Sequence, residues 1–351
     1  MSALMQDVCD RALDLGVPIS VQFDLTYRCN ERCVHCYLDH EDYGELTTAE
    51  VKSILDQLAA AGTFFLIFSG GELLLRKDFF QLVAYARRLG FDLKMKTNAI
   101  LIREREAERL LALGVRQVQI SIYSHRPEIH DAITKVPGSL ARSLAAIRFL
   151  KAKGLKVLIA NVLMRHNLGD YAGVQALARE LGAEYTLDPT ITPRMDGNPD
   201  LLQHRIPGSE LFRIFSDKNL VGEGFCTPPK GAADEATLDS LPCSAGHTAA
   251  YISPYGDVYP CVQFPLPCGN LRTQPFLEVW RNSKQLAEVR SIRVRDLPTC
   301  STCSLAQDCT RCPGLAYMEG NLRGPSSADC EKSMIRAKLA TETALQGERV
   351  S

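Results

Sequence analysis

Three cysteines stand close together near the start of the chain, in the stretch CNERCVHCY. Cys29, Cys33 and Cys36 have the spacing C-x3-C-x2-C. Thiolates bind zinc and iron–sulfur clusters, but a closed four-ligand site needs one ligand more. Three interpretations follow from the triplet alone: buried structural cysteines, a zinc site that borrows His35 or His40, or a [4Fe–4S] cluster with one iron that has no protein ligand.

The position of the triplet favours the cluster. A strand-like run precedes the cysteines, and a second run leads directly into Gly70, Gly71 and Glu72. Glycines let a backbone approach a ligand closely, and a glutamate can accept hydrogen bonds from an ammonium group. Because an iron without a protein ligand can bind a small molecule, the two loops together indicate a site for chemistry.

Six strand-like runs alternate with helical segments over the first two-thirds of the chain. The strands are expected at residues 21–26, 64–69, 93–98, 118–123, 157–164 and 185–191. The helices are expected at residues 48–61, 78–89, 104–113, 139–153 and 170–181, and several end in glycine, as helix C-termini do. This repeat predicts an α/β fold with a parallel sheet. Six units in place of eight predict a partial (β/α)6 TIM-like barrel or a curved open sheet, with ligands at the carboxyl ends of its strands.

The triplet and the GGE stretch resemble the radical S-adenosylmethionine (SAM) superfamily, whose signature is C-x3-C-x2-C followed by GGE on a partial six-unit barrel. The resemblance extends over residues 18–195. It implies that SAM chelates the open iron through its amino and carboxylate groups. It further implies that one electron, from a donor such as flavodoxin or ferredoxin, cleaves SAM to methionine and a 5′-deoxyadenosyl radical that abstracts a substrate hydrogen.

The resemblance assigns roles to individual residues. Three match the cluster ligands: Cys29, Cys33 and Cys36. Three match the motif that holds the SAM ammonium: Gly70, Gly71 and Glu72. Asn98 and Ser121, near the ends of the third and fourth strands, match polar positions that contact the SAM ribose or carboxylate. Arg165, after the fifth strand, is either a bidentate partner of the carboxylate or a solvated charge.

The chain departs from the family pattern at three positions. Leu73 replaces the proline that usually follows GGE. Ala99 replaces the glycine of a TNG stretch, so it is expected to do without the positive φ that a glycine allows. Thr134 stands about where relatives carry an arginine near SAM, which leaves the carboxylate contact open.

Nine of the thirteen cysteines lie between Cys226 and Cys330, in a region rich in loops. Such a segment buries little hydrophobic core, so bound metal is expected to stabilise its fold. Two CxxC pairs lie here with only five residues between them, whereas a zinc ribbon usually has 15 to 20. The number of thiols fits two multinuclear clusters better than one zinc ion or disulfides.

The cysteine pattern resembles the SPASM domain, an auxiliary-cluster domain of radical SAM peptide maturases. The stretches GDVYPC (256–261) and GNLRTQPFLEVW (269–280) also match the usual sequence of this domain. The resemblance implies one or two auxiliary iron–sulfur clusters. Cluster I would take Cys243, Cys261 and Cys312. Cluster II would take Cys300, Cys303, Cys309 and Cys330. The fourth ligand of cluster I stays open between Cys268, Cys226 and none.

Cys226 lies in a connector rich in proline and glycine, and three roles remain open for it: cluster ligand, donor of a hydrogen atom to a substrate radical, or idle thiol. The expected domains are an N-terminal helix (1–17), a radical SAM core (18–215), a linker (216–240), a SPASM domain (241–335) and a C-terminal tail (336–351). Cys9 is expected on a face of the first helix.

The combination of domains points to a peptide substrate, crosslinked, epimerised or oxidised during the maturation of a ribosomally made precursor. Only 28 residues precede Cys29, so a separate peptide-recognition protein is an expected partner. Asp188, Arg194 and Asp196 would face the open side of the barrel, as substrate contacts or as turn residues. The alternatives are a radical SAM enzyme of tetrapyrrole, haem or other small-molecule biosynthesis, and a non-catalytic iron–sulfur electron carrier.

Composition excludes several other partners. The formal net charge of −1 provides no global field for nucleic acid or an anionic membrane. The most apolar stretch, TFFLIFSGG, is too short to span a bilayer, and the N-terminus lacks the apolar core of a signal peptide. A cytoplasmic enzyme is expected.

Overall fold

The computed structural model describes residues 3–221 and 231–348. The chain divides into two compact units. The first contains Met1–His204 and Ala245–Arg290, and the second contains Arg205–Ser244 and Ser291–Ser351. Part of the SPASM-like segment therefore belongs to the same unit as the barrel strands.

The first unit is built on a nine-stranded sheet with the order β6-β5-β4-β3-β2-β1-β7-β8-β9. The strands are β1 (Ser20–Thr26), β2 (Phe65–Gly70), β3 (Asp92–Thr97), β4 (Gln117–Ser121), β5 (Lys156–Val162), β6 (Glu184–Asp188), β7 (Ala249–Ile252), β8 (Asp257–Tyr259) and β9 (Gly269–Asn270). Neighbouring strands from β6 through β1 to β7 are parallel, while β8 and β9 are antiparallel. The six expected strands and the partial barrel are confirmed, and β7 to β9 lengthen its sheet.

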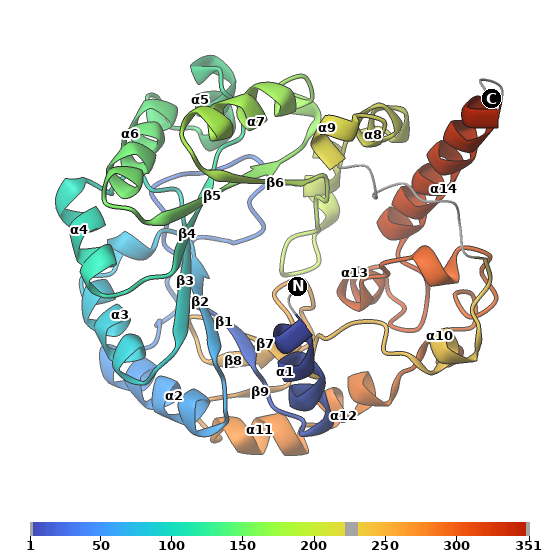
Figure 1. Ribbon diagram of the computed structural model, residues 1–351. Helices are drawn as coiled ribbons and strands as arrows, with labels where there is room; N and C mark the ends of the chain where they lie inside the picture. The colour runs from blue at the N-terminus through green and yellow to red at the C-terminus, as the bar shows by residue number, and fades with distance from the viewer. Residues whose placement is uncertain (1–2, 222–230, 349–351) are drawn as a thin grey trace. The chain divides into compact units, whose positions relative to one another are not determined.

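Helices follow the barrel strands and lie outside the curved sheet (Figure 1). The five expected helices are present as α2 (Thr48–Ala60), α3 (Phe79–Arg88), α4 (Glu104–Ala112), α6 (Ser139–Ala152) and α7 (Tyr171–Glu180). The remaining helices of this unit are α1 (Ala3–Asp14), α5 (Pro127–Thr134), α11 (Phe276–Asn282) and α12 (Lys284–Ser291). The sequence analysis missed α5, because it expected no element between the fourth strand and residue 139.

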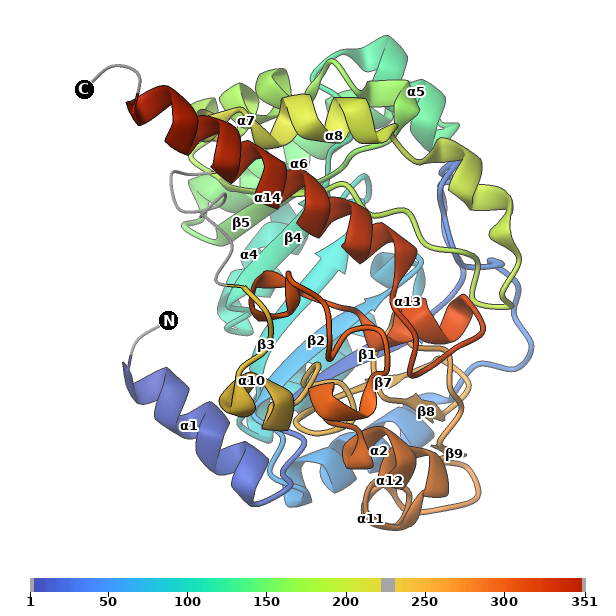
Figure 2. The ribbon, with the colours of Figure 1, turned by 90° about the vertical axis from the view of Figure 1, so that its right-hand side faces the viewer.

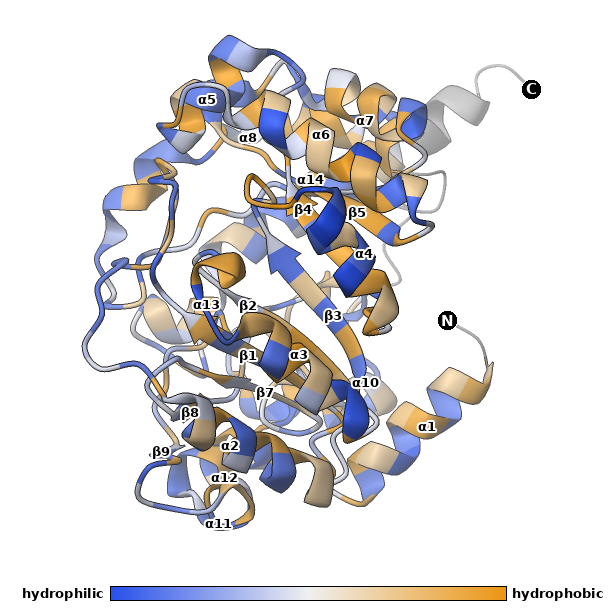
Figure 3. Ribbon diagram, turned by 90° about the vertical axis from the view of Figure 1, so that its left-hand side faces the viewer, coloured by the Kyte–Doolittle hydropathy of each residue, from blue (hydrophilic) through white to orange (hydrophobic). Residues whose placement is uncertain are grey.

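Strands β1, β3 and β4 are apolar toward the helices and carry polar side chains on the other face. Side chains such as Phe23, Phe68 and Ile120 are fully buried in the core. Alternate positions point the other way, because successive side chains of a strand face opposite sides of a sheet. On that face Lys96 and Gln119 line a pocket. The ribbon of β3 accordingly shows hydrophilic and hydrophobic bands in alternation (Figure 3).

The second unit is mainly helical and irregular. Its helices are α8 (Gly208–Phe215), α9 (Lys218–Val221), α10 (Glu235–Asp239), α13 (Pro313–Met318) and α14 (Ser327–Glu348). Helix α14 packs against α8 and is the long helix seen in Figure 2. The sequence analysis treats residues 336–351 as a tail, whereas 336–348 continue this helix. Across the described residues, no helix is both long and apolar enough to cross a bilayer.

Candidate functional site

A pocket of about 250 Å³ lies at the carboxyl ends of the barrel strands. It is lined by residues from the loops after β1 and β2 and from the ends of β3, β4 and β6. Most of the residues that the sequence analysis singled out in the barrel line it: Cys29, Cys33, His35, Cys36, His40, Gly70, Gly71, Asn98, Ser121 and Asp188. The fold thus brings together side chains that lie up to about 160 positions apart in the sequence.

The two glycines of the GGE stretch hold the loop after β1 in contact with the loop after β2. The amide of Gly71 donates to the carbonyl of Thr26 at 2.7 Å, and the amide of Glu72 donates to the carbonyl of Arg28 at 2.9 Å. A Cβ atom on Gly70 or Gly71 would overlap the backbone carbonyls of Thr26 and Arg28. The glycines are therefore required for the close approach of the loop that leads into the first cysteine.

Glu72 has other partners than the ammonium group that the sequence analysis expects. Its side chain is fully buried and does not line the pocket. The carboxylate accepts hydrogen bonds from the Thr97 hydroxyl (2.6 Å) and from the amides of Asn98 (3.0 Å) and Leu74 (3.1 Å). Burial raises the pKa of Glu72, and these bonds oppose the rise. In the structure Glu72 holds the end of β3 in place.

The expectation that Ala99 avoids a positive φ is wrong. Ala99 has φ +65° and is fully buried. An alanine in this region costs roughly 1–2 kcal/mol, so its surroundings must impose it. The amide of Ala99 donates to the Thr97 hydroxyl at 2.9 Å, and the carbonyl of Asn98 accepts from the Ser143 hydroxyl at 2.8 Å. Together these bonds fix the turn that presents Asn98 to the pocket.

Two side chains that the sequence analysis did not assign lie at the cysteines. The amide nitrogen of Asn98 donates to the side-chain oxygen of Asn30 at 2.7 Å and lies 3.8 Å from the Cys29 sulfur. The Tyr123 hydroxyl lies 3.8 Å from the Cys33 sulfur. Asn30 stands inside the cysteine stretch, but no local pattern marks Tyr123, because its proximity depends on the fold.

The three thiols of this pocket are buried, so they need a cationic partner in order to ionise. Burial raises the pKa of Cys29 to about 12 and also raises the pKa values of Cys33 and Cys36. A bound iron–sulfur cluster supplies the charge that keeps coordinating thiols deprotonated. Among the described residues, no three His, Cys, Asp or Glu side chains gather tightly enough for one metal ion. Three thiols sharing a pocket fit a larger group.

Arg165 and Thr134, the two positions considered for the SAM carboxylate, do not line the pocket. Arg165 is exposed at the start of a 3-10 helix, Arg165–Asn167. Thr134 is fully buried and its hydroxyl shares a hydrogen bond with Ser139 at 2.7 Å. The structure therefore gives Arg165 the position of a solvated charge and Thr134 a packing position.

The segment after β6 behaves mainly as a turn. Arg194 pairs with Asp200 at 3.0 Å and also donates to the carbonyl of Cys36 at 3.4 Å. The Asp196 carboxylate accepts from the amide of Asn198 at 2.9 Å. Asp188 is the residue of this group that lines the pocket.

A second cavity, of about 720 Å³, lies within the second unit. The four cysteines expected to bind auxiliary cluster II line it together: Cys300, Cys303, Cys309 and Cys330. Arg311 lines it too, with only 7% of its surface exposed. Its Nε donates to the carbonyl of Gly324 at 2.8 Å, while Nη1 is buried without a hydrogen-bond partner among the described residues. Four thiols beside a buried cation fit an anionic cluster.

The cysteines expected for auxiliary cluster I are divided between the units. Cys243 and Cys312 belong to the second unit and Cys261 to the first. Of the two candidates for a fourth ligand, Cys268 is 7% exposed in the core of the first unit, where its thiol donates to the carbonyl of Leu266 at 3.3 Å. Cys226 lies outside the described residues. None of the twelve cysteines that the structure describes forms a disulfide.

Two protein families match the chain. The Radical SAM superfamily matches residues 23–174. SPASM, an iron–sulfur cluster-binding domain, matches residues 243–313. The first match includes the cysteine triplet, and the second includes six of the cysteines assigned to the auxiliary clusters: Cys243, Cys261, Cys300, Cys303, Cys309 and Cys312.

Curated relatives match most of the chain. The AdoMet-dependent heme synthase of Methanosarcina barkeri is 30% identical over 86% of this chain and 93% of its own length. The mycofactocin maturase MftC of Mycobacterium ulcerans is 30% identical over 93% of this chain and 92% of its own length. The PqqA peptide cyclase of Xanthomonas campestris is 30% identical over 78% of this chain and 76% of its own length.

Among solved structures, Streptococcus suis SuiB bound to its precursor peptide SuiA has a TM-score of 0.72 and 17% sequence identity. The similarity covers 93% of this chain and 79% of SuiB. At this identity the similarity shows a shared fold.

Proposed function

This chain belongs to the radical SAM superfamily and carries a SPASM iron–sulfur domain, and from this premise we propose that it modifies a ribosomally made peptide. The enzyme binds a [4Fe–4S] cluster, SAM and auxiliary iron–sulfur clusters. When reduced, the [4Fe–4S] cluster supplies the electron that cleaves SAM to a 5′-deoxyadenosyl radical, which abstracts a hydrogen atom from the substrate.

The protein's own residues have defined tasks in this proposal. Cys29, Cys33 and Cys36 would hold the cluster. Gly70 and Gly71 keep the cysteine loop in place and leave room on the pocket wall. Asn98 and Ser121, also on that wall, would hold polar groups of SAM, and the surrounding barrel would exclude water. Glu72 would act indirectly, through the turn that it braces.

The similarity to two peptide-modifying relatives supports a peptide substrate: the maturase MftC is 30% identical over 93% of this chain, and the PqqA peptide cyclase is 30% identical over 78% of it. The polar side chains on the inner face of the barrel also support a peptide substrate. Uncharged hydrogen-bonding side chains such as Ser69 and Gln119 line the pocket beside the charged ones. Such side chains can pair with the amide groups of a peptide backbone.

The test is a reaction of the anaerobically reconstituted enzyme with SAM, reductant and synthetic peptides encoded by short reading frames beside the gene. The expected result is a mass change in one peptide together with 5′-deoxyadenosine. The Cys29→Ala/Cys33→Ala/Cys36→Ala variant serves as the control and should give neither. Formation of 5′-deoxyadenosine without modification of any encoded peptide would contradict the peptide proposal while leaving the radical chemistry intact.

The second candidate is tetrapyrrole chemistry, which the similarity to the heme synthase supports. A porphyrin titrated into the enzyme would then change its visible absorbance on binding and its mass after reaction. The same control variant applies. A porphyrin product in the absence of a peptide product would make tetrapyrrole chemistry the proposed function in place of peptide modification.

We further propose two partners and a location. An electron donor such as flavodoxin or ferredoxin would reduce the cluster, and a separate recognition protein could deliver the peptide. The cytoplasm is the proposed location, because thiols stay reduced there and remain available to bind iron. For Cys226 we keep the proposal that it donates a hydrogen atom or binds a cluster.

A further inference from the structure

A second row of polar side chains lies below the proposed SAM contacts inside the barrel. Asp24 on β1 is in register with Ser69 on β2, and Lys96 on β3 is in register with Gln119 on β4. Lys96 precedes Asn98 by two residues, so the row lies about 7 Å deeper along the strands. Ser69, Lys96 and Gln119 line the same pocket as the three cysteines.

Lys96 is the distinctive member of this row. Of the described residues that line the pocket, it alone is a lysine or arginine. Its ammonium group donates to the side-chain oxygen of Gln22 at 2.9 Å. An ammonium group has three N–H donors, so two remain for a ligand in the pocket. The side-chain amide of Gln119 beside it makes no hydrogen bond within the described part of the chain.

The nearby carboxylate of Asp24 is already occupied and cannot bind a ligand. It is fully buried and accepts hydrogen bonds from the Gln22 amide (3.0 Å) and the Tyr251 hydroxyl (3.0 Å). The Tyr251 hydroxyl in turn shares a 2.6 Å hydrogen bond with the hydroxyl of Tyr27. Gln22 thus links Asp24 to Lys96 and orients both without closing a direct ion pair. The lysine is held in place while its remaining donors stay available.

We propose that Lys96 and Gln119 form a subsite that binds a carboxylate of the substrate. The inference rests on the proposed radical SAM function and adds the chemical group by which the substrate is held. A single ammonium point charge flanked by a neutral amide suits a monoanion. A phosphate dianion would meet more repulsion, because the carboxylates of Asp188 and Glu31 line the same pocket.

The depth of the subsite separates it from the SAM contacts. Asn98, which directly follows β3, lies at the level of the cysteines, with its side-chain amide 3.8 Å from the Cys29 sulfur. Lys96 lies one pleat deeper, toward the amino ends of the strands. A carboxylate bound there therefore belongs to the substrate and not to the methionyl part of SAM. Peptides and tetrapyrroles both carry carboxylates, and the two sources can be separated by experiment.

The test uses the reconstituted enzyme with SAM and two matched pairs of probes. One pair is a random pentapeptide pool with free C-terminal carboxylates and the same pool with C-terminal amides. The other pair is protoporphyrin IX and its dimethyl ester. Retention of each probe is measured by anaerobic ultrafiltration and mass spectrometry. The wild type should retain the acid form of one pair at least about tenfold better than the neutral form.

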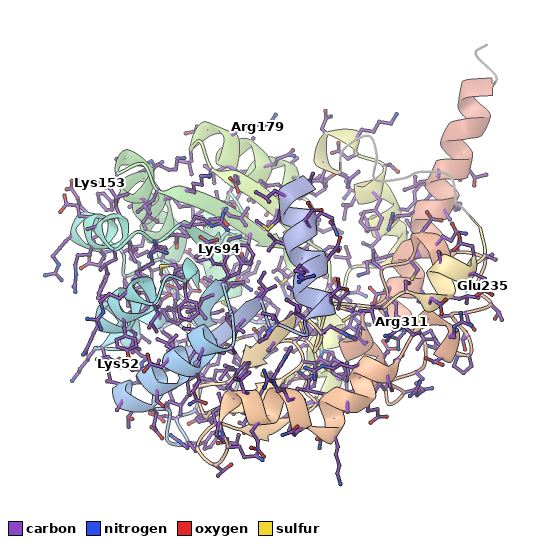
Figure 4. All side chains as sticks on the ribbon, turned by 60° about the horizontal axis from the view of Figure 1, so that its bottom comes forward. Lys52, Lys94, Lys153, Arg179, Glu235 and Arg311 are labelled. Carbon is purple, nitrogen blue, oxygen red and sulfur yellow. The ribbon has the colours of Figure 1, made fainter. Side chains whose placement is uncertain are left out.

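Three variants test the role of the lysine. Lys96→Met should abolish the preference for the acid form, while Lys96→Arg should restore part of it. Lys94→Met is the matched control, because Lys94 lies on the same strand and, two positions from Lys96, on the same face, but does not line the pocket. Lys94 is labelled in Figure 4. SAM binding, measured by equilibrium dialysis, should remain unchanged in all three, and Lys94→Met should also leave unchanged the amount of 5′-deoxyadenosine formed without substrate.

The outcomes separate the subsite from the identity of the substrate. A preference for acid peptides that Lys96→Met abolishes supports both the subsite and the peptide. The same result with the porphyrin pair supports the subsite and overturns the peptide. Equal retention of acid and neutral forms by the wild type, no retention of any probe, or a preference that survives Lys96→Met overturns the subsite. So does a loss of SAM binding in Lys96→Met, which would assign the lysine to SAM.

Discussion

The two thiol-lined cavities of this protein differ in what surrounds their sulfurs. In the barrel, three cysteines share a pocket with hydrogen-bonding side chains from five strand ends or loops. In the second unit, four cysteines share a cavity with Arg311 and with both apolar and polar neighbours. The first arrangement leaves one ligand position and a polar wall for another molecule. The second supplies a complete set of thiols.

The difference indicates a division of labour. An iron cluster held by three thiolates has one iron free to bind SAM, so its pocket must also recognise SAM and substrate. A cluster held by four thiolates has no free position and suits electron transfer or a structural role. The number of thiols, three against four, therefore distinguishes the two cavities.

Removing each set of cysteines should give the largest effect. We expect Cys29→Ala/Cys33→Ala/Cys36→Ala to lose about four irons and all formation of 5′-deoxyadenosine. Cys300→Ala/Cys303→Ala/Cys309→Ala should also lose about four irons but keep SAM cleavage without substrate. Iron content and 5′-deoxyadenosine are measured after anaerobic reconstitution. Equal loss of SAM cleavage in both variants would remove the distinction between the cavities.

The charge network below the barrel pocket should make that unit sensitive to pH. Burial raises the pKa of Asp24 from 3.8 to about 6. The folded state therefore binds this proton more tightly than the unfolded state, and the resulting stability, about 3 kcal/mol, is complete below about pH 3.8 and lost as the pH rises through about 6. Asp24→Asn should lack this part of the decline. Urea unfolding between pH 4 and 7 measures the difference.

A second variant tests whether Asp24 is the group that titrates. Tyr251→Phe removes one hydrogen bond that favours the ionised carboxylate, so it should raise the pKa of Asp24 further and extend the decline to higher pH. Identical pH profiles for Asp24→Asn and the wild type would show that the buried carboxylate does not titrate in this range.

Glu72 provides a test of how the barrel pocket is supported. Glu72→Gln removes the charge that accepts bonds from Thr97 and Asn98, and the loss should cost roughly 2 kcal/mol of unfolding free energy. SAM binding should weaken along with stability, while the iron of the second unit should be retained. If SAM binding is lost at unchanged stability, Glu72 contacts SAM directly, as the sequence motif alone suggests.

Arg311 should give the smallest effect, confined to the second cavity. Arg311→Met removes the buried cation beside the four thiols, and we expect iron to be lost to a chelator about tenfold faster. Arg311→Lys should restore part of the retention, because it keeps the charge. The rate of 5′-deoxyadenosine formation without substrate serves as the control. Unchanged iron retention in Arg311→Met would mean that the cation does not support the cluster.

Local patterns were sufficient for the parts of the fold that short-range physics controls. The alternation of strands and helices followed from periodicity and from glycines at helix ends. Cys29, Cys33 and Cys36 were found because a cluster loop needs its thiols close together in the chain. The same reasoning failed for Ala99, because its positive φ is imposed by its hydrogen bond to the Thr97 hydroxyl and by the hydrogen bond that the Ser143 hydroxyl donates to the preceding carbonyl.

The amino-acid sequence by itself determined the barrel, the two groups of cysteines and the family to which the chain belongs. Tertiary structure decided that Glu72 faces the end of β3, that β7 to β9 extend the barrel sheet, and that Lys96 and Gln119 meet in the pocket. The physical reason is distance along the chain. A thiol motif is local, whereas the partner of a buried charge is set by which strands become neighbours.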